Sequence, residues 1–278
     1  MDSSDVLTTP ESNPDEAWRL ETARSKVHDE FNLPQSPLPF GVLLCSLALG
    51  AGLLAGLGSW LIGEATVDAF KPPMAQFEMM GQTLFKAQFE DQLSADAKNA
   101  TLAFAVLGGT LGLALGIAGG LARKSGRAGF RAGVFGLVLG GLVGSGISLA
   151  LLPIYHHALA RSPEEMSHDI ILPLLVHGGI WSACGLAGGV AFGIGLGAGR
   201  GRVFNAALGG LIGAALGAAL YEIVGVAMFP ASKTTSPISL TWNTRLLARM
   251  LVASLSGLLA AAVVNMPDRR HVKVKSSS

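Results

Sequence analysis

Six long runs of apolar residues alternate with shorter polar segments along this chain. They cover residues 40–62, 100–122, 133–155, 174–196, 203–225 and 246–264. Because the hydrocarbon core of a bilayer is about 30 Å thick, a helix of roughly 20 apolar residues crosses it. The runs are too long for the strands of a membrane barrel and lack their alternating pattern. The sequence therefore predicts an all-α membrane protein, a bundle of six glycine-rich transmembrane helices.

Glycine recurs at every fourth position inside four of these runs. Residues spaced by four lie on nearly one face of a helix. In lipid, a row of glycines lets two helix backbones approach closely, whereas in water each internal glycine would cost about 1 kcal/mol relative to alanine. The pattern predicts tight helix packing through Gly108, Gly112, Gly116, Gly120, Gly136, Gly140, Gly144, Gly185, Gly189, Gly193, Gly197, Gly209, Gly213 and Gly217.

The second and third runs resemble the fourth and fifth. The glycine spacing of the second run returns in the fourth, and LGGLVGSG at 139–146 resembles LGGLIGAA at 208–215. Internal repeats of this kind are common in transporters. The similarity predicts a parallel duplication of residues 100–155 and 174–225. The alternative is chance similarity between segments that are rich in glycine, alanine and leucine.

Basic residues gather in alternate connections between the runs. The connection after the second run contains four of them, the connection after the fourth contains Arg200 and Arg202, and residues 267–278 form a basic tail. Lysine and arginine are enriched in cytoplasmic loops, which predicts that both termini are cytoplasmic. We expect a short amphipathic helix within the polar segment 1–38 and a transmembrane domain over 39–266. Compact loops and the lack of a targeting signal favour a bacterial plasma membrane.

The long connection between the first and second runs carries apolar residues at helical spacing. Met74, Phe77, Leu84 and Ala87 would fall on one face of a helix. This pattern predicts an amphipathic helix over residues 74–96, lying in the outer membrane interface. The alternatives are that its apolar face caps the bundle or binds a partner.

Composition excludes several functional classes. The net charge is +1, which provides no basic surface for nucleic acid, and two cysteines are too few for a disulfide framework. The chain contains no phosphate-binding glycine loop, no nucleophile elbow and no HExxH metal motif. We therefore expect neither an enzyme nor a cofactor. His156, His157 and His168 lack the spacing of a metal site, and whether they bind a metal stays open.

Four ionisable residues lie within or at the edge of the apolar runs, at similar depth near the outer side: Glu64, His177, Glu222 and Arg249. Charged groups are costly inside a membrane, so each is a candidate for function. Glu222 is the strongest candidate, because a carboxyl in apolar surroundings suits the handling of protons or cations. The alternative is a structural pair of Glu222 with Arg249 near the headgroup region. For His177, the alternative is a hydrogen-bonded residue of the core.

Two functions from different classes fit these features. In the first, the protein is a non-enzymatic membrane component that acts through tight helix packing and association with a membrane-protein partner or with itself. The lack of clustered charges at mid-membrane favours this function, as do the nearly continuous faces of small residues. In the second, it is a small-solute or ion permease with an outer polar site around Glu222 and His177, which the duplication favours. In both, the lipid bilayer surrounds the protein.

Overall fold

The computed structural model describes residues 40–79, 82–161, 171–229 and 238–266. Its elements in chain order are α2 (Phe40–Ala65), β1 (Met74–Met79), β2 (Gln82–Ala87), α3 (Phe89–Ala122), α4 (Gly126–Arg161), α6 (Ile171–Gly195), α7 (Arg200–Met228) and α8 (Trp242–Val264). All six helices are long and apolar enough to cross a membrane. The predicted all-α membrane bundle is therefore confirmed. The predicted N-terminal helix and the basic C-terminal tail lie outside the described residues.

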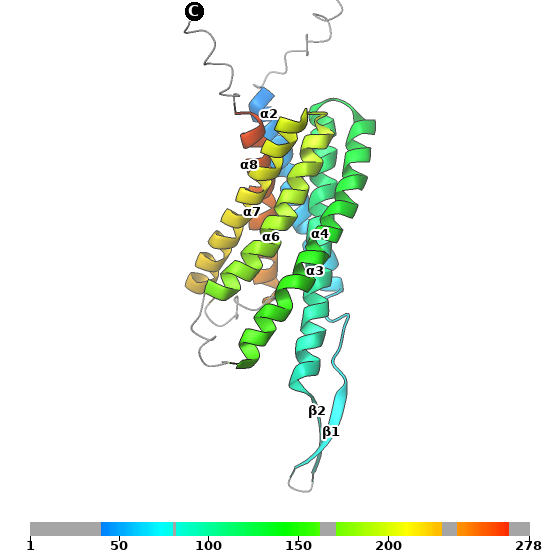
Figure 1. The fold of residues 1–278 in the computed structure, drawn as a ribbon, viewed down its shortest axis with the longest axis vertical. Helices are drawn as coiled ribbons and strands as arrows, with labels where there is room; N and C mark the ends of the chain where they lie inside the picture. The colour runs from blue at the N-terminus through cyan, green and yellow to red at the C-terminus, as the bar shows by residue number, and fades with distance from the viewer. Residues whose placement is uncertain (1–39, 80–81, 162–170, 230–237, 267–278) are drawn as a thin grey trace, which may run out of the picture. The chain divides into compact units, whose positions relative to one another are not determined.

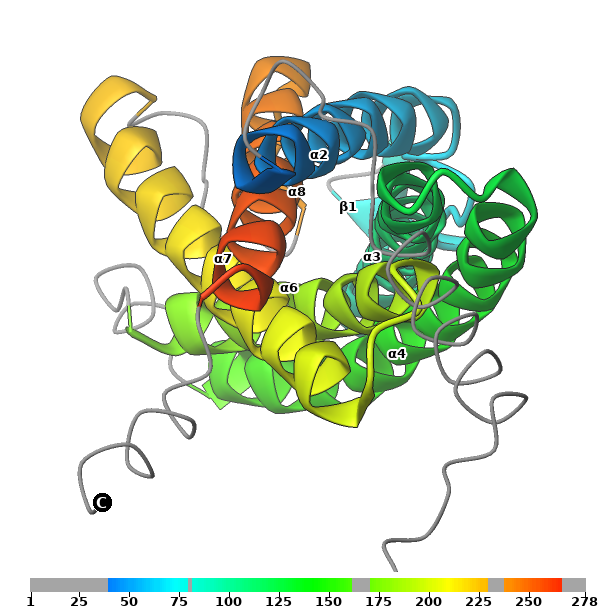
Figure 2. The same cartoon turned by 90° about the horizontal axis from the view of Figure 1, so that it is seen from above.

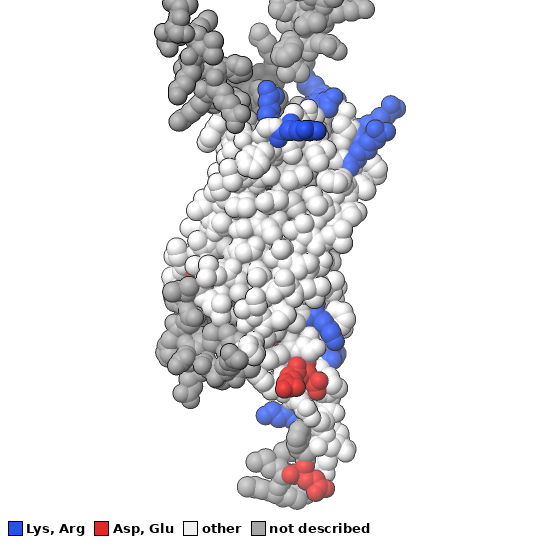
Figure 3. All heavy atoms as spheres, viewed as in Figure 1, with Lys and Arg blue, Asp and Glu red and all other residues white. Residues whose placement is uncertain are grey.

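Consecutive helices run in opposite directions and pack side by side (Figures 1 and 2). Seen along the helices, α8 lies between α2 and α7 (Figure 2). The α3–α4 and α6–α7 connections lie at one end, which we call the basic end because Lys and Arg side chains gather there (Figure 3). These side chains are Arg123, Lys124, Arg127, Arg131, Arg200 and Arg202. The opposite end carries β1 and β2, and we call it the hairpin end.

Residues 74–87 form a β-hairpin, so the prediction of one helix over 74–96 was wrong for this part. β1 pairs antiparallel with β2, from Met74 opposite Ala87 to Met79 opposite Gln82. Two residues separate the strands in the sequence, and one of them is Gly81, a residue type that favours tight hairpin turns. Hydrogen bonds between strands thus replace those of a helix. Within residues 74–96, helical structure begins only at Phe89, the first residue of α3, and this helix continues directly into its membrane-spanning part.

Glycines lie where neighbouring helices cross, with one backbone directly against the other. Between α3 and α4, a methyl group added to Gly108 or Gly112 would overlap the main chain of Gly140 or Gly136. Between α6 and α7, the facing pairs are Gly185 with Gly210, Gly189 with Ala206, and Gly193 with Val203. Close backbone approach of this kind is a main source of helix association in lipid. The α3–α4 pair and the α6–α7 pair are therefore each held together largely through main-chain contacts.

Helix α7 presents glycine to two neighbours. Gly210 contacts α6, whereas the main chain of α8 packs against Gly209, Gly213 and Gly217. Gly140, which matches Gly209 in the sequence comparison, instead faces the other helix of its own hairpin. Gly140 and Gly209 thus contact different neighbours, whereas the corresponding Gly108 and Gly185 both contact the next helix in the chain. The duplication of 100–155 and 174–225 stays a prediction.

The connection between α6 and α7 turns at Gly197, which lies beyond the end of α6 in a turn and not at a helix crossing as the sequence predicted. Its φ of +63° lies in the left-handed region, where residues with a Cβ are strained. The guanidinium of Arg123, which directly follows α3, lies against this glycine, so a side chain at this position would displace it. The turn therefore brings the α3–α4 pair and the α6–α7 pair into contact at the basic end.

Buried side chains form two clusters of different character. Toward the hairpin end, the cluster contains the aromatic residues Phe104, Tyr155, Trp181 and Tyr221. Toward the basic end, it consists of leucines and alanines with Phe192 and lacks other aromatic rings among the described residues. The buried ionisable side chains lie in the half of the bundle toward the hairpin end, which we call the hairpin half. The other half is the basic half. The candidate site is therefore at the hairpin end of the bundle.

Candidate functional site

His177 and Glu222 meet inside the bundle as a buried pair. His177 lies in the second turn of α6 and Glu222 near the end of α7, and His177 Nδ1 is 3.4 Å from Glu222 Oε1. The residues are only 1% and 4% exposed. The remaining polar atoms, His177 Nε2 and Glu222 Oε2, are buried without a hydrogen-bond partner among the described residues. Buried polar atoms without partners are costly and rare, so this pair requires an explanation.

Aromatic rings surround the pair. The ring centroid of Trp181 lies 5.7 Å from that of His177, and the centroid of Tyr155 lies 6.4 Å from it. Tyr221, the neighbour of Glu222 in sequence, packs edge-on against Trp181 with centroids 5.5 Å apart. Trp181 lies one helical turn beyond His177, so one face of α6 presents both side chains. In these apolar surroundings, a charge on His177 or Glu222 interacts more strongly with nearby charges and dipoles than it would in water.

A second ion pair joins α2 to α8. Arg245 Nε and Nη2 donate to the two carboxylate oxygens of Glu64 at 2.6 and 2.7 Å. Arg245 Nη1 also donates to the carbonyl oxygens of Ser239 and Leu240, each at 3.0 Å. A bidentate contact between arginine and carboxylate is both strong and directional. This contact therefore holds the start of α8, and the segment before it, against the end of α2.

Arg249 lies one turn beyond Arg245 and contacts α2. It donates to the carbonyl oxygen of Ser59, and its guanidinium lies against Gly63, where a methyl group would overlap it. Among the described residues, the ionisable partner of Glu222 is His177, so the alternative pair of Glu222 with Arg249 does not form. The four candidates thus form two groups. His177 pairs with Glu222, whereas Glu64 and Arg249 lie near Arg245, where α2 meets α8.

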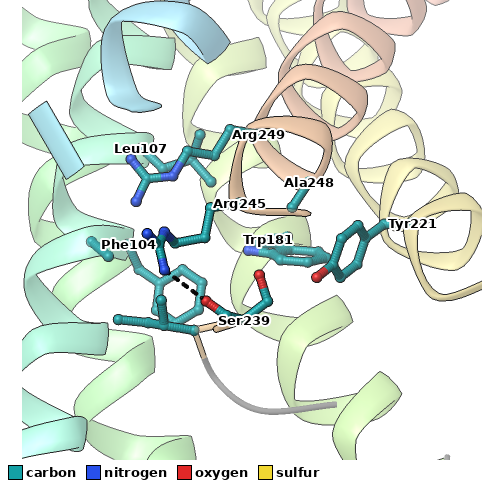
Figure 4. A pocket seen from close by; sticks show the side chains of 10 residues that line it. Phe104, Leu107, Trp181, Tyr221, Ser239, Arg245, Ala248 and Arg249 are labelled. Atoms are coloured by element: carbon teal, nitrogen blue, oxygen red, sulfur yellow. Dashed lines mark hydrogen bonds between the residues drawn. The ribbon is translucent and has the colours of Figure 1, made fainter. Parts of the chain in front are cut away.

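Two cavities lie in this half of the bundle. The smaller has a volume of about 40 Å³, space for a single water molecule or a small ion, and is lined by Arg245, Arg249, Trp181 and Tyr221 among others (Figure 4). In Figure 4, both arginines extend from α8, while Trp181 and Tyr221 lie beside Ser239.

The larger cavity, which we call the vestibule, has a volume of about 400 Å³ at the hairpin end. Asp68, Asp96, His156 and Tyr155 line it, and it shares Arg245 with the smaller cavity. Its wall is held by Asn99 of α3, whose side chain accepts from Phe70 N and donates to Phe70 O, both at 2.9 Å. Because Tyr155 lines the vestibule and also packs against His177, it separates the vestibule from the buried pair.

The three histidines considered as metal ligands do not assemble in the part of the chain that the structure describes. His156 lines the vestibule beside Asp96, and His168 lies outside the described residues. No group of three potential His, Cys, Asp or Glu ligands occurs among the described residues.

Sequence reasoning did not single out four residues that organise this site. Arg245 directly precedes the last apolar run, and its spacing of four from Arg249 places both on one helix face. Tyr155, Asn99 and Ser239 gave no signal of their own, because their roles depend on contacts between distant segments.

Comparison with protein families, with characterised proteins and with solved structures found no match. The six apolar helices indicate an integral membrane protein in a lipid bilayer. Chemical groups that could carry a more specific function lie at the hairpin end, where the ionisable pair and the cavities are.

Proposed function

We propose that this protein is a non-enzymatic permease for protons or small cations, with His177 and Glu222 as its ion-handling pair. The observation that carries the proposal is the burial of both side chains in one contact, with one polar atom on each left without a hydrogen-bond partner among the described residues. Ionisable residues inside a membrane bundle are rare and typically mark ion and proton pathways. A pair needed only for packing would be expected to satisfy all of its polar atoms.

The pair suits reversible ion binding because it carries different charges in different protonation states. With His177 neutral and Glu222 ionised, the pair holds one buried negative charge next to aromatic rings. A proton on the imidazole, or a cation at the second carboxylate oxygen, neutralises that charge and lowers its desolvation cost. Asp68 and Asp96 would attract cations into the vestibule, because its Arg245 is paired with Glu64, and Tyr155 lies between the vestibule and the pair.

The two halves of the bundle fit a permease that is closed on one side. The basic half is filled by apolar side chains and by glycines packed against main chain. The hairpin half contains the vestibule, the small cavity and the buried ionisable residues. Transport would then require the helices of the basic half to separate, as in alternating access.

Flux through liposomes tests the proposal. The full-length protein is reconstituted, and uptake of protons and of sodium is measured with fluorescent indicators under an imposed potassium diffusion potential. We expect flux of one ion above that of empty liposomes, and its loss in Glu222→Gln. The control is Ile223→Val, because Ile223 is the next residue and is 65% exposed on the outside of the bundle. Flux equal to that of empty liposomes, or full flux in Glu222→Gln, contradicts the proposal.

The second candidate is a membrane component that binds a partner, and the β-hairpin is the observation that favours it. The hairpin lies beyond the end of the helices, with Met74 and Phe85 67% and 63% exposed (Figure 1). Two-stranded hairpins are only marginally stable alone in water, and their free edges can pair with another strand. Native mass spectrometry of gently extracted protein tests it. A stoichiometric partner that is retained by wild type and lost in Phe85→Ser supports this candidate, whereas an identical spectrum for both proteins contradicts it.

A further inference from the structure

Two apolar grooves lie between helices on the outside of the bundle. The α6–α7 groove has a volume of about 620 Å³ and is lined by apolar side chains, including Leu186, Val190 and Leu208, together with Arg200. The α2–α3 groove has a volume of about 480 Å³ and is lined by Gly50, Gly58 and other small or apolar residues, with no charged side chain among those described. Both volumes fall in the range of ligand-binding clefts. The grooves therefore differ mainly in charge.

One mouth of the α6–α7 groove carries positive charge. Arg200 begins α7 at the basic end and lines the groove directly. Arg123 lies against Gly197, which is the neighbour of the groove residue Ala198. The acidic residues of the described ranges all belong to the opposite half: Glu64, Asp68, Glu78, Glu90, Asp91, Asp96 and Glu222. An anion at this mouth would thus meet the guanidinium of Arg200 and no described carboxylate.

We propose that the α6–α7 groove binds one anionic phospholipid, with an acyl chain along the groove and the phosphate at Arg200. In a bilayer the groove faces hydrocarbon, and its exposed residues, such as the 67% exposed Phe204, are compatible only with apolar contacts. The basic end lies at headgroup depth, because α7 begins there after a short connection. Basic pockets between membrane helices at this depth are typical sites for anionic lipids. Guanidinium binds phosphate with paired hydrogen bonds, which a zwitterionic headgroup accepts less favourably because its own cation competes.

The α2–α3 groove provides an internal control for this proposal. It has a comparable volume and an apolar lining, but no charged residue among its described ones. A lipid chain there would be held without selection for its headgroup. A preference for anionic lipid that depends on the α6–α7 groove therefore reports the charge at its mouth rather than apolar contact.

Native mass spectrometry of the full-length protein tests the proposal. The protein is placed in nanodiscs of equal phosphatidylglycerol and phosphatidylcholine, released, and its retained lipids are counted. We expect one phosphatidylglycerol retained about tenfold over phosphatidylcholine in wild type, the ratio that a charge-assisted hydrogen bond supplies. Arg200→Gln should lose most of this preference. Val190→Trp fills the groove and should lose the retained lipid itself.

Two control variants separate a groove site from general attraction to the basic end. Arg127→Gln removes a basic residue that does not line the groove, and Gly50→Leu fills the α2–α3 groove. Both should keep the preference of wild type. The proposal is overturned if Arg200→Gln retains lipid as wild type does, or if Val190→Trp elutes and melts normally yet still retains phosphatidylglycerol. It is also overturned if Arg127→Gln loses the preference equally. None of these outcomes depends on ion flux.

Discussion

The most direct test of the α3–α4 packing compares two glycines on one helix, Gly140 and Gly146 of α4. A Cβ added to Gly140 would overlap the carbonyl group of Gly108 and lie 3.2 Å from Gly109 N, so α3 and α4 would have to separate. A Cβ added to Gly146 would meet nothing within 4 Å. We expect Gly140→Ala to destabilise the bundle and Gly146→Ala to be neutral or stabilising.

The expected magnitude follows from two opposing contributions. Alanine has a higher helix propensity than glycine by about 1 kcal/mol, and this gain is common to both variants. Forcing an extra methyl group into a packed interface costs about 1–3 kcal/mol, and only Gly140→Ala bears this cost. The difference between the variants therefore isolates the steric cost, with an expected value of about 1–3 kcal/mol.

Unfolding in mixed micelles measures this difference. Dodecyl sulfate is titrated into protein in a mild detergent, and helix content is followed by circular dichroism. Equal unfolding midpoints for Gly140→Ala and Gly146→Ala would refute the reasoning, because the α3–α4 crossing would then tolerate a side chain. A lower midpoint for Gly146→Ala would refute it as well, since that position is open to its surroundings.

Three further predictions concern the connections between elements. Gly197→Ala should cost at least about 1 kcal/mol, because the residue has a positive φ and lies against a guanidinium; the same micelle titration measures it. Asn99→Ala removes two hydrogen bonds to Phe70, worth about 0.5–1.5 kcal/mol each, and limited proteolysis should show faster cleavage near residue 70 while helix content is unchanged. Glu64→Gln leaves Arg245 without its charged partner and should lower stability by about 1–3 kcal/mol in the micelle titration, with Glu78→Gln on the exposed β1 strand as the neutral control.

The transmembrane helices could be predicted from the sequence because one physical quantity, the length of apolar helix, decides whether a segment spans a bilayer. The segment 74–87 could not be predicted in the same way. Its apolar residues fit a helical face, but Gly81 interrupts the segment at the centre, and this residue was the available signal for a turn. Apolar spacing alone is ambiguous in so short a segment.

The membership of the candidate site was predicted better than its contacts. His177 and Glu222 were both singled out because each places an ionisable group in an apolar run. Their pairing depends on the rotation of α6 and α7 about their axes, which the glycine contacts between these helices determine. Arg249 lies at a similar depth but contacts α2, so depth along the chain did not reveal which neighbour each side chain meets.

Helix α7 meets α6 and α8 through glycine along its middle turns, and the side chains of Tyr221 and Glu222 contact α6 only near its end. Interlocked side chains must change rotamer when one helix slides past another, whereas smooth faces allow axial displacement with little repacking. Glu222 is carried by α7 and His177 by α6, and the pair spans this smooth boundary. A small shear of α7 would therefore separate the two ionisable groups while both helices stay intact, which gives the bundle a mechanical means of coupling helix position to the charge in its interior.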